Sequence, residues 1–567
     1  MKPRDLWCFL VAAVYILVRL GFVVESARLG DGGVKVQVPR SRKTLEAYAT
    51  LLYGDEFLLG VRVLGKSIRD TGTTRDMVAL VSDGVSPYAV QLLQADGWIV
   101  EHIGLLANPN QKRPKRFWGV YTKLKIFNMT NYKKVVYLDA DTVVLRSIDD
   151  LFQCRKFCAN LKHSERLNSG VMVVEPSESV FKDMMAKVTT LPSYTGGDQG
   201  FLNSYYGDFP NARLFEPNLS ADELKSRPEP SMERLSTLYN ADVGLYMLAN
   251  KWMVDGSELR VVHYTLGPLK PWDWWTAWLL KPVDLWQGFR VKLEGSLPGT
   301  EGENDPHKQL IVRILFVLPL LVALFYGRRF LIQVPVQQGL LCNWSFCGYV
   351  RQLYYKYKSG SSLPIYSTVG VTSSVSTNQQ YANGLGGVSN AHKLPPYLGV
   401  LSIFVSFLSV AVSVGVAAFL VPRQVMPWTG IMLAYEWSFF LFMIIFGKYL
   451  DVVNAWGKSS ASGTYAGGSS DSSEYDSGKG HQRHTSSCDA ATFYSGVGMA
   501  VLAILIPSLP FIFGVTALFL RLALMIGGGL VLVSFMTYAS EHLAIRSFLK
   551  GREDRNLLNS TYLCCGF

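Results

Sequence analysis

The sequence predicts an α/β domain with a mostly parallel sheet, followed by a multi-span α-helical membrane domain. Residues 44–300 alternate strand-like apolar runs with helical patterns, which is typical of βαβ units. After residue 300 the apolar runs approach about 20 residues, the length that crosses a bilayer. Hydrophobic residues make up 49% of the 567 residues and charged residues only 17%, which is apolar for a soluble protein.

An apolar run covers residues 6–24 near the N-terminus, directly after the basic residues Lys2 and Arg4. We expect residues 1–24 to be either a cleaved signal peptide or a retained transmembrane anchor. No cleavage site is convincing, because Glu25 stands where a small residue is preferred. Either alternative carries the next segment across the membrane. Residues 25–43 are expected to form a polar stem.

Five strand-like runs define the expected α/β domain. They cover residues 45–54, 76–84, 133–141, 168–176 and 259–265.

The membrane domain is expected over residues 301–567, with about five spans and disordered cytosolic loops. The expected spans are 310–326, 398–421, 428–446, 493–518 and 522–538. A single such run could also be a buried core helix. Five runs with at most one charge in each favour membrane helices.

The net charge of +11 does not predict a nucleic-acid partner, because the basic clusters lie beside the apolar runs. The positive-inside rule then gives one topology. Residues 25–309 are lumenal, and the loops 327–397 and 447–492 are cytosolic. In the lumenal part, Cys154 and Cys158 could pair in an oxidising compartment, although a helical spacing of four would make that disulfide awkward.

Two carboxylates, Asp139 and Asp141, follow the apolar run 135–138. Residues i and i+2 of a strand point the same way, so both side chains can reach one point. Oxygen ligands suit a hard divalent cation, and open α/β sheets bind ligands at the carboxyl ends of their strands. The alternative is a solvated turn.

A histidine and two lysines extend this candidate site. His263 follows the short apolar run 259–262, and imidazole suits Mn²⁺ better than Mg²⁺ or Ca²⁺. Gly267 and Lys270 could meet a diphosphate, and Lys123 is a second candidate cation. The alternatives are a structural histidine and an ordinary helix-surface lysine.

Two stretches have the composition of a sugar pocket. Asn168 and Ser169 precede an apolar run, and Asp198 and Gln199 follow two glycines. Such side chains hold hydroxyl groups with directed hydrogen bonds. Ordinary turn chemistry is the alternative.

Taken in order, these motifs resemble glycosyltransferase family 8, in its glycogenin-like branch. The resemblance covers about residues 44–285 and rests on "TLLYGDEFLLGVRVLGKSI", "TKL", "DADTVVLRSIDDLF", "NSGV", "GGDQGFLN" and "VVH". It implies a GT-A fold, a UDP-sugar donor, a bound Mn²⁺ and retention of the anomeric configuration.

The resemblance also assigns roles. It implies that Asp139, Asp141 and His263 bind Mn²⁺, and that Asp198, Gln199 and Lys123 are catalytic. The residues implied to bind the donor are Leu51, Tyr53 and Phe57 for uridine, Gly267 and Lys270 for the diphosphate, and Lys123, Asp139, Ala140, Asp141, Asn168, Ser169, Asp198, Gln199 and His263 around the metal and the sugar.

The chain departs from glycogenin at Thr195, where glycogenin has an aspartate. Loss of that carboxylate fits an anionic sugar such as glucuronate. The interval from His263 to Gly267 is one residue longer than in glycogenin, which leaves the phosphate contacts open.

The C-terminal spans are not glycogenin-like, and they resemble the plant Golgi branch that acts on sphingolipids. That resemblance implies UDP-glucuronate as donor, inositol phosphorylceramide as acceptor, and a multi-pass Golgi protein with a lumenal catalytic domain. One alternative is a family 8 transferase for another UDP-sugar or for a polysaccharide such as xylan. Another is a non-catalytic transporter or scaffold, although only Arg313 and Glu436 place charge inside the expected spans.

An aromatic cluster comprises Trp272, Trp274, Trp275 and Trp278. Tryptophan favours the membrane interface, so this cluster could help to bring a lipid head group to the donor. Simple packing at the end of the domain is the alternative.

Overall fold

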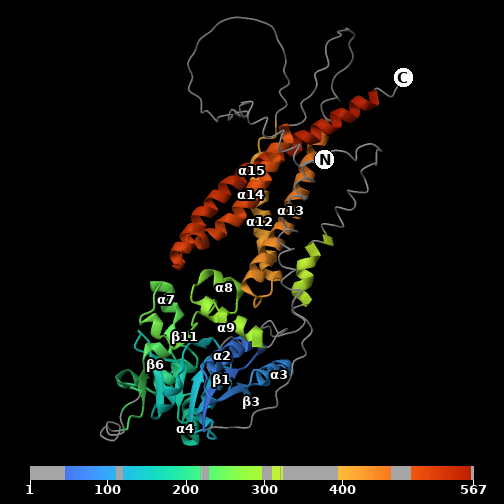
Figure 1. Ribbon diagram of the computed structural model, residues 1–567. Coiled ribbons are helices and arrows are strands. Elements are labelled where there is room, and N and C mark those ends of the chain that lie inside the picture. The colour runs from blue at the N-terminus through green and yellow to red at the C-terminus, as the bar shows by residue number, and fades with distance from the viewer. Residues whose placement is uncertain are drawn as a thin grey trace, which may run out of the picture. The chain divides into compact units, whose positions relative to one another are not determined.

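The structure is a computed structural model (Figure 1). It describes residues 45–109, 119–217, 219, 229–296, 310–319, 321–322, 394–460 and 487–563, the last range without side chains at 487–496 and 554–563. The expected anchor, the stem and most of the expected cytosolic loops lie outside the described residues.

An eight-stranded sheet in the order β3-β2-β1-β4-β7-β6-β9-β8 forms the centre of the N-terminal domain. Only β7 among its described strands runs antiparallel to its neighbours β4 and β6, so the prediction of a mostly parallel α/β sheet is confirmed. The strands are β1 (Glu46–Leu52), β2 (Asp76–Val81), β3 (Ile99–His102), β4 (Lys134–Leu138), β6 (Phe157–Leu161), β7 (Leu167–Val174), β8 (Arg213–Leu214) and β9 (Glu233–Leu235).

Both faces of this sheet are covered, which explains why its central strands read as continuous apolar runs. On β4, Val136 and Leu138 face a core that includes residues of α2 (Leu58–Asp70) and α3 (Pro87–Ala95). Val135 and Tyr137 face the other core. The opposite side is formed by η2 (Val120–Asn128), α4 (Glu178–Lys187) and α5 (Asp198–Tyr205).

A second sheet of three strands receives the chain directly after β4. It contains β10 (Ala241–Asp242), β11 (Val261–His263) and β5 (Thr142–Val144) in that order. The strand β5 is antiparallel to β11, and Thr142 lies opposite His263. Residues 139–141 therefore lie at the carboxyl end of β4, as the sequence suggested, but the strand itself ends at Leu138 and these residues connect the two sheets.

The cysteines Cys154 and Cys158 form a disulfide bond. Cys154 follows the short helix η3 (Asp149–Gln153) and Cys158 lies on β6, so neither is part of a continuous helix. The helical geometry that would have opposed the bond is absent from this described segment.

Four long helices follow in the C-terminal part: α12 (Leu398–Leu420), α13 (Pro427–Ser460), α14 (Ser487–Ile512) and α15 (Leu518–Leu563). By length and composition, three described segments could cross a membrane: Leu398–Leu420, Pro427–Ser460 and Leu518–Glu553. Two shorter apolar helical segments are Leu310–Pro319 and Val497–Ile512. The expected span 493–518 is interrupted, since Gly514 has a φ of +62° and follows the end of α14.

Hydrogen bonds join the segment after the small sheet to the loop between α12 and α13. Asp273, which precedes α8 (Trp274–Leu279), accepts a hydrogen bond from Arg423 Nη2 at 2.9 Å. Arg290, on α9 (Val283–Ser296), donates to the carbonyl of Gln424 at 2.6 Å. Both Asp273 and Arg290 are buried, so these contacts satisfy polar groups that would otherwise be costly.

The expected aromatic cluster is divided by the fold. Trp272 is only 4% exposed and packs edge-on against Phe57 at 5.8 Å between ring centroids, so it belongs to the core. Trp274 packs against the backbone of α13 at Gly430, where an added Cβ would overlap its ring. The packing alternative therefore describes these two tryptophans.

The buried pair Arg62–Asp96 gives a test of the core. Both side chains are 0% exposed, with 2.6 Å between Arg62 Nε and Asp96 Oδ2. We expect Asp96→Asn to lower the free energy of unfolding by about 3–5 kcal/mol, because it removes the buried carboxylate that pairs with the buried Arg62 guanidinium. Thermal unfolding of the full chain in detergent measures this as a lower midpoint.

The matched control is Asp70→Asn, which breaks the partly exposed Lys66–Asp70 pair. That change should cost less than about 1 kcal/mol. Equal midpoints for the two variants would contradict the prediction.

Candidate active site

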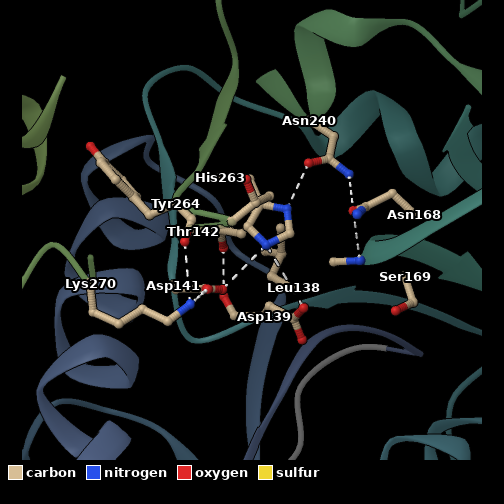
Figure 2. A network of polar contacts seen from close by, with 12 residues as sticks. Leu138, Asp139, Asp141, Thr142, Asn168, Ser169, Asn240, His263, Tyr264 and Lys270 are labelled. Atoms are coloured by element: carbon tan, nitrogen blue, oxygen red, sulfur yellow. Dashed lines mark hydrogen bonds and ion pairs between the residues drawn. The ribbon is translucent and has the colours of Figure 1, made fainter. Parts of the chain in front are cut away.

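Three candidate metal ligands meet where the two sheets join (Figure 2). His263 Nε2 lies 3.3 Å from Asp141 Oδ1 and 3.9 Å from Asp139 Oδ2. One ligand atom from each residue can be chosen so that all three lie within 4.8 Å of one another. The sequence predicted these residues, and the fold brings them together.

A chain of hydrogen bonds fixes the tautomer of His263. The backbone N–H of Gly170 donates to Asn168 Oδ1, which therefore is the oxygen, and Asn240 Nδ2 donates to the same atom at 2.8 Å. Asn240 Oδ1 then faces His263 Nδ1 at 2.9 Å and must accept its proton. In the neutral ring, Nε2 is left with a lone pair directed at the two carboxylates, as a metal ligand requires.

Glycine at position 170 leaves room for the imidazole. A Cβ at Gly170 would lie 2.6 Å from His263 Nδ1, which is closer than such atoms pack. On the other side of the site, a Cβ at Gly60 of α2 would lie 2.6 Å from the carbonyl oxygen of Ala140. The two glycines let β7 and α2 approach the ligands closely.

Two lysines hold the aspartates. Lys123 Nζ lies 2.9 Å from Asp139 Oδ1 and 3.1 Å from Asp198 Oδ2, and Lys270 Nζ lies 2.5 Å from Asp141 Oδ2. Burial alone would raise the pKa of Asp141, but the adjacent Lys270 ammonium group holds it well below its usual value. Burial alone would lower the pKa of Lys123, but Asp139 and Asp198 raise it. Asp141 is therefore a carboxylate and Lys123 an ammonium group around neutral pH.

The four residues of the predicted sugar pocket form one network with Lys123. Ser169 Oγ donates to Asp198 Oδ2 at 2.9 Å, and Asn168 Nδ2 donates to Gln199 Oε1 at 3.0 Å. Asp198 and Gln199 begin helix α5, while Asn168 and Ser169 lie on β7. Lys123 Nζ also contacts the carbonyl of Ser169 at 3.3 Å, so the pocket and the metal ligands share one cation.

The predicted uridine residues lie in and after β1. Leu51 is 6% exposed in the core, and the rings of Tyr53 and Phe57 lie 5.2 Å apart. Gly267 is partly exposed in the loop between His263 and Lys270. Their contacts with uridine and diphosphate remain predictions.

Sequence reasoning missed Asn240 and Tyr137. Asn240 sets the tautomer of His263 from 23 positions earlier in the chain, and Tyr137 Oη donates to Asp139 Oδ1 at 2.8 Å. An asparagine beside a short strand carries no metal-ligand spacing, so nothing in the sequence distinguishes it. Tyr137 lies two residues before Asp139, and its position on the same side of the strand was the only available signal.

This arrangement can hold a divalent cation. Two carboxylates and a neutral imidazole suit Mn²⁺ or a similar transition metal, and flanking lysines could neutralise additional anionic groups such as phosphates.

The chain is similar to known glycosyltransferases. The family description "Glycosyl transferase family 8" matches residues 51–160. "Inositol phosphorylceramide glucuronosyltransferase 1" of Arabidopsis thaliana is 59% identical over 99% of this chain and 98% of its own length. "Putative UDP-glucuronate:xylan alpha-glucuronosyltransferase 3" of the same plant is 34% identical over 47% of this chain and 42% of its own length.

Among solved structures, galactosyltransferase LgtC in complex with donor and acceptor sugar analogs matches with a TM-score of 0.32. Its sequence is 17% identical, and the match covers 44% of this chain and 96% of LgtC.

The close contact at Gly170 predicts the effect of a single methyl group. Gly170→Ala should displace the His263 ring and weaken Mn²⁺ binding by about tenfold or more, the effect typical of lost ligand orientation. Electron paramagnetic resonance of free Mn²⁺ during a titration measures this affinity.

The control is Gly104→Ala, because a Cβ at Gly104 would meet nothing within 4 Å. It should bind Mn²⁺ as the unaltered chain does. Unchanged affinity in Gly170→Ala would show that His263 is not a ligand.

Proposed function

This chain belongs to glycosyltransferase family 8, and from that premise we propose that it transfers glucuronic acid from UDP-glucuronate to inositol phosphorylceramide. It is a glycosyltransferase with a GT-A-type catalytic domain followed by apolar helices that could span a membrane. The reaction proposed is a retaining one, as the sequence resemblance implies.

The observation that carries the proposal is the extent of the first similarity. The relative named as an inositol phosphorylceramide glucuronosyltransferase matches this chain through both the catalytic domain and the C-terminal helices. The relative named for xylan matches less than half of the chain. A polysaccharide acceptor would also give no role to the long apolar helices after residue 390, so we favour a lipid acceptor.

We propose Mn²⁺ as the metal held by Asp139, Asp141 and His263. An imidazole ligand favours a transition metal over Mg²⁺. A bound divalent cation would stabilise the negative charge that develops on the diphosphate leaving group. Lys270, which already lies beside Asp141, is positioned to add a second positive charge there, and Gly267 would let the backbone approach the phosphates.

The proposed catalytic residues are Lys123, Asp198 and Gln199. Lys123 bridges Asp139 of the metal site and Asp198 of the sugar pocket, so it can align the donor sugar with its phosphate. Gln199 accepts hydrogen bonds from Asn168 and Ser169, and its amide lies partly exposed at the pocket. Fixed polar groups of this kind lower the barrier by orienting the reactants before reaction.

We further propose a multi-pass Golgi protein whose catalytic domain is lumenal. The positive-inside pattern of the sequence supports this orientation. The Cys154–Cys158 disulfide also supports it, because such bonds persist in oxidising compartments.

The direct test uses the purified full chain in vesicles with inositol phosphorylceramide and a panel of UDP-sugars. We expect transfer from UDP-glucuronate and none from Asp141→Ala, because the variant lacks a metal ligand that also pairs with Lys270. Mass spectrometry of the lipid product identifies the sugar and the acceptor. Transfer to xylan oligosaccharides with no lipid product would refute the proposed acceptor.

The orientation predicts which sequon carries an N-glycan. Asn128 is exposed at the end of η2 and precedes Met129 and Thr130, so we expect a glycan there. Asn218 is a second lumenal candidate, and Asn343 is predicted to be cytosolic and unmodified; both lie outside the described residues. Glycopeptide mapping decides this, and a glycan on Asn343 would reverse the proposed topology.

A further inference from the structure

Arg166 lies over the ring of Tyr194, which is hydrogen-bonded to Gln199 of the predicted sugar pocket, and no carboxylate among the described residues forms an ion pair with it. We propose that Arg166 binds the carboxylate of the donor sugar and thereby selects a uronic acid over a neutral hexose. The inference rests on the proposed function, since it concerns the sugar of the same donor.

Arg166 lies in a tight turn, and its side chain lies over an aromatic ring. Its carbonyl accepts a hydrogen bond from the N–H of Lys162 at 2.9 Å, which closes the turn between β6 and β7. Its guanidinium carbon lies 4.0 Å from the centroid of the Tyr194 ring. Both side chains are exposed, so a ligand can reach them.

Tyr194 connects this arginine to the pocket. Gln199 Nε2 donates to Tyr194 Oη at 3.0 Å, and Gln199 Oε1 accepts from Asn168 Nδ2 at 3.0 Å. The ring on which Arg166 rests is therefore hydrogen-bonded to a residue proposed to hold the sugar. Arg166 also precedes Asn168 by two residues, the spacing at which extended residues point to the same side.

Charge balance distinguishes Arg166 from the other cations nearby. Lys123 pairs with Asp139 and Asp198, Lys270 with Asp141, and Lys162 with Asp242. Within the part of the chain that the structure describes, no carboxylate forms an ion pair with Arg166. Its positive charge is left for a ligand.

The turn before α5, residues 193–197, contains no acidic side chain. Thr195 Oγ1 accepts hydrogen bonds from the backbone N–H groups of Gly197 at 3.2 Å and Gly200 at 3.0 Å. The neutral hydroxyl of Thr195 therefore binds the backbone at the start of α5. The nearby Asp198 carboxylate is bound by Lys123 and Ser169.

The stacking geometry suits a carboxylate. A guanidinium that lies over an aromatic face uses its π surface there, so the N–H groups at its edge stay available. Those donors match the two oxygens of a carboxylate in a bidentate pair. A neutral hexose carries a hydroxymethyl group in place of that carboxylate and offers no charge to bind.

The test compares two donors in the full-length enzyme with the same lipid acceptor. Arg166→Gln should lower kcat/KM for UDP-glucuronate by about tenfold to a hundredfold, mainly through KM, as expected for loss of a charge-assisted hydrogen-bonded pair. Its kcat/KM for UDP-glucose should stay the same or rise. Arg166→Lys should recover part of the preference for UDP-glucuronate over UDP-glucose. It restores the positive charge but not the planar guanidinium that can donate two parallel hydrogen bonds.

The control is Arg146→Gln, which removes an exposed arginine that pairs with Glu258 on the same domain. It should leave both donors unaffected. If Arg166→Gln lowers the values for both donors equally, Arg166 has a structural role and the inference is overturned. If the unaltered enzyme itself shows no preference for UDP-glucuronate, the proposed donor is wrong and the inference falls with it.

Discussion

The catalytic domain depends on the electrostatic balance at the junction of its two sheets. Without nearby positive charge, Asp139 and Asp141 would repel each other. Their partial burial would further raise the free energy of the two ionised carboxylates. Lys123 forms an ion pair with Asp139 and Lys270 with Asp141, and His263 directs Nε2 toward both aspartates. Asp139, Asp141 and His263 could together hold a divalent cation. Lys123 also contacts Asp198 and Ser169, so the candidate metal ligands and the predicted sugar-binding residues belong to one network.

The sequence singled out the three candidate metal ligands because their spacing and their neighbours carry the signal. Asp139 and Asp141 follow an apolar strand, and His263 ends another. It did not predict that the chain leaves one sheet for a second at residues 139–141, since β5 and β10 are too short to show a pattern. The sequence also did not predict the role of Asn240, because that role depends on contacts between residues distant in the chain. Its role arises from a hydrogen-bond chain through Asn168 to a backbone amide, which exists only after β7 and β11 are brought together.

In the C-terminal half, too, the sequence predicted the kind of segment better than the contacts of individual side chains. Apolar length predicted α12 and the first part of α13 closely, but Gly514 breaks one expected span. Trp272 looked like an interfacial aromatic residue and is instead buried against Phe57, because its neighbours in space come from α2 and η1 (Asp55–Phe57) rather than from the sequence around it. Composition identifies the kind of segment, whereas tertiary contacts decide what each side chain does.

The central claim is that one metal held by Asp139, Asp141 and His263 is required for glucuronosyl transfer. The most direct measurement removes metal from the purified full-length enzyme with a chelator, assays transfer to inositol phosphorylceramide, and then restores Mn²⁺. The account predicts that transfer is lost and then recovered, and that His263→Ala needs far more Mn²⁺ for recovery. Full transfer by the chelator-treated enzyme would contradict it.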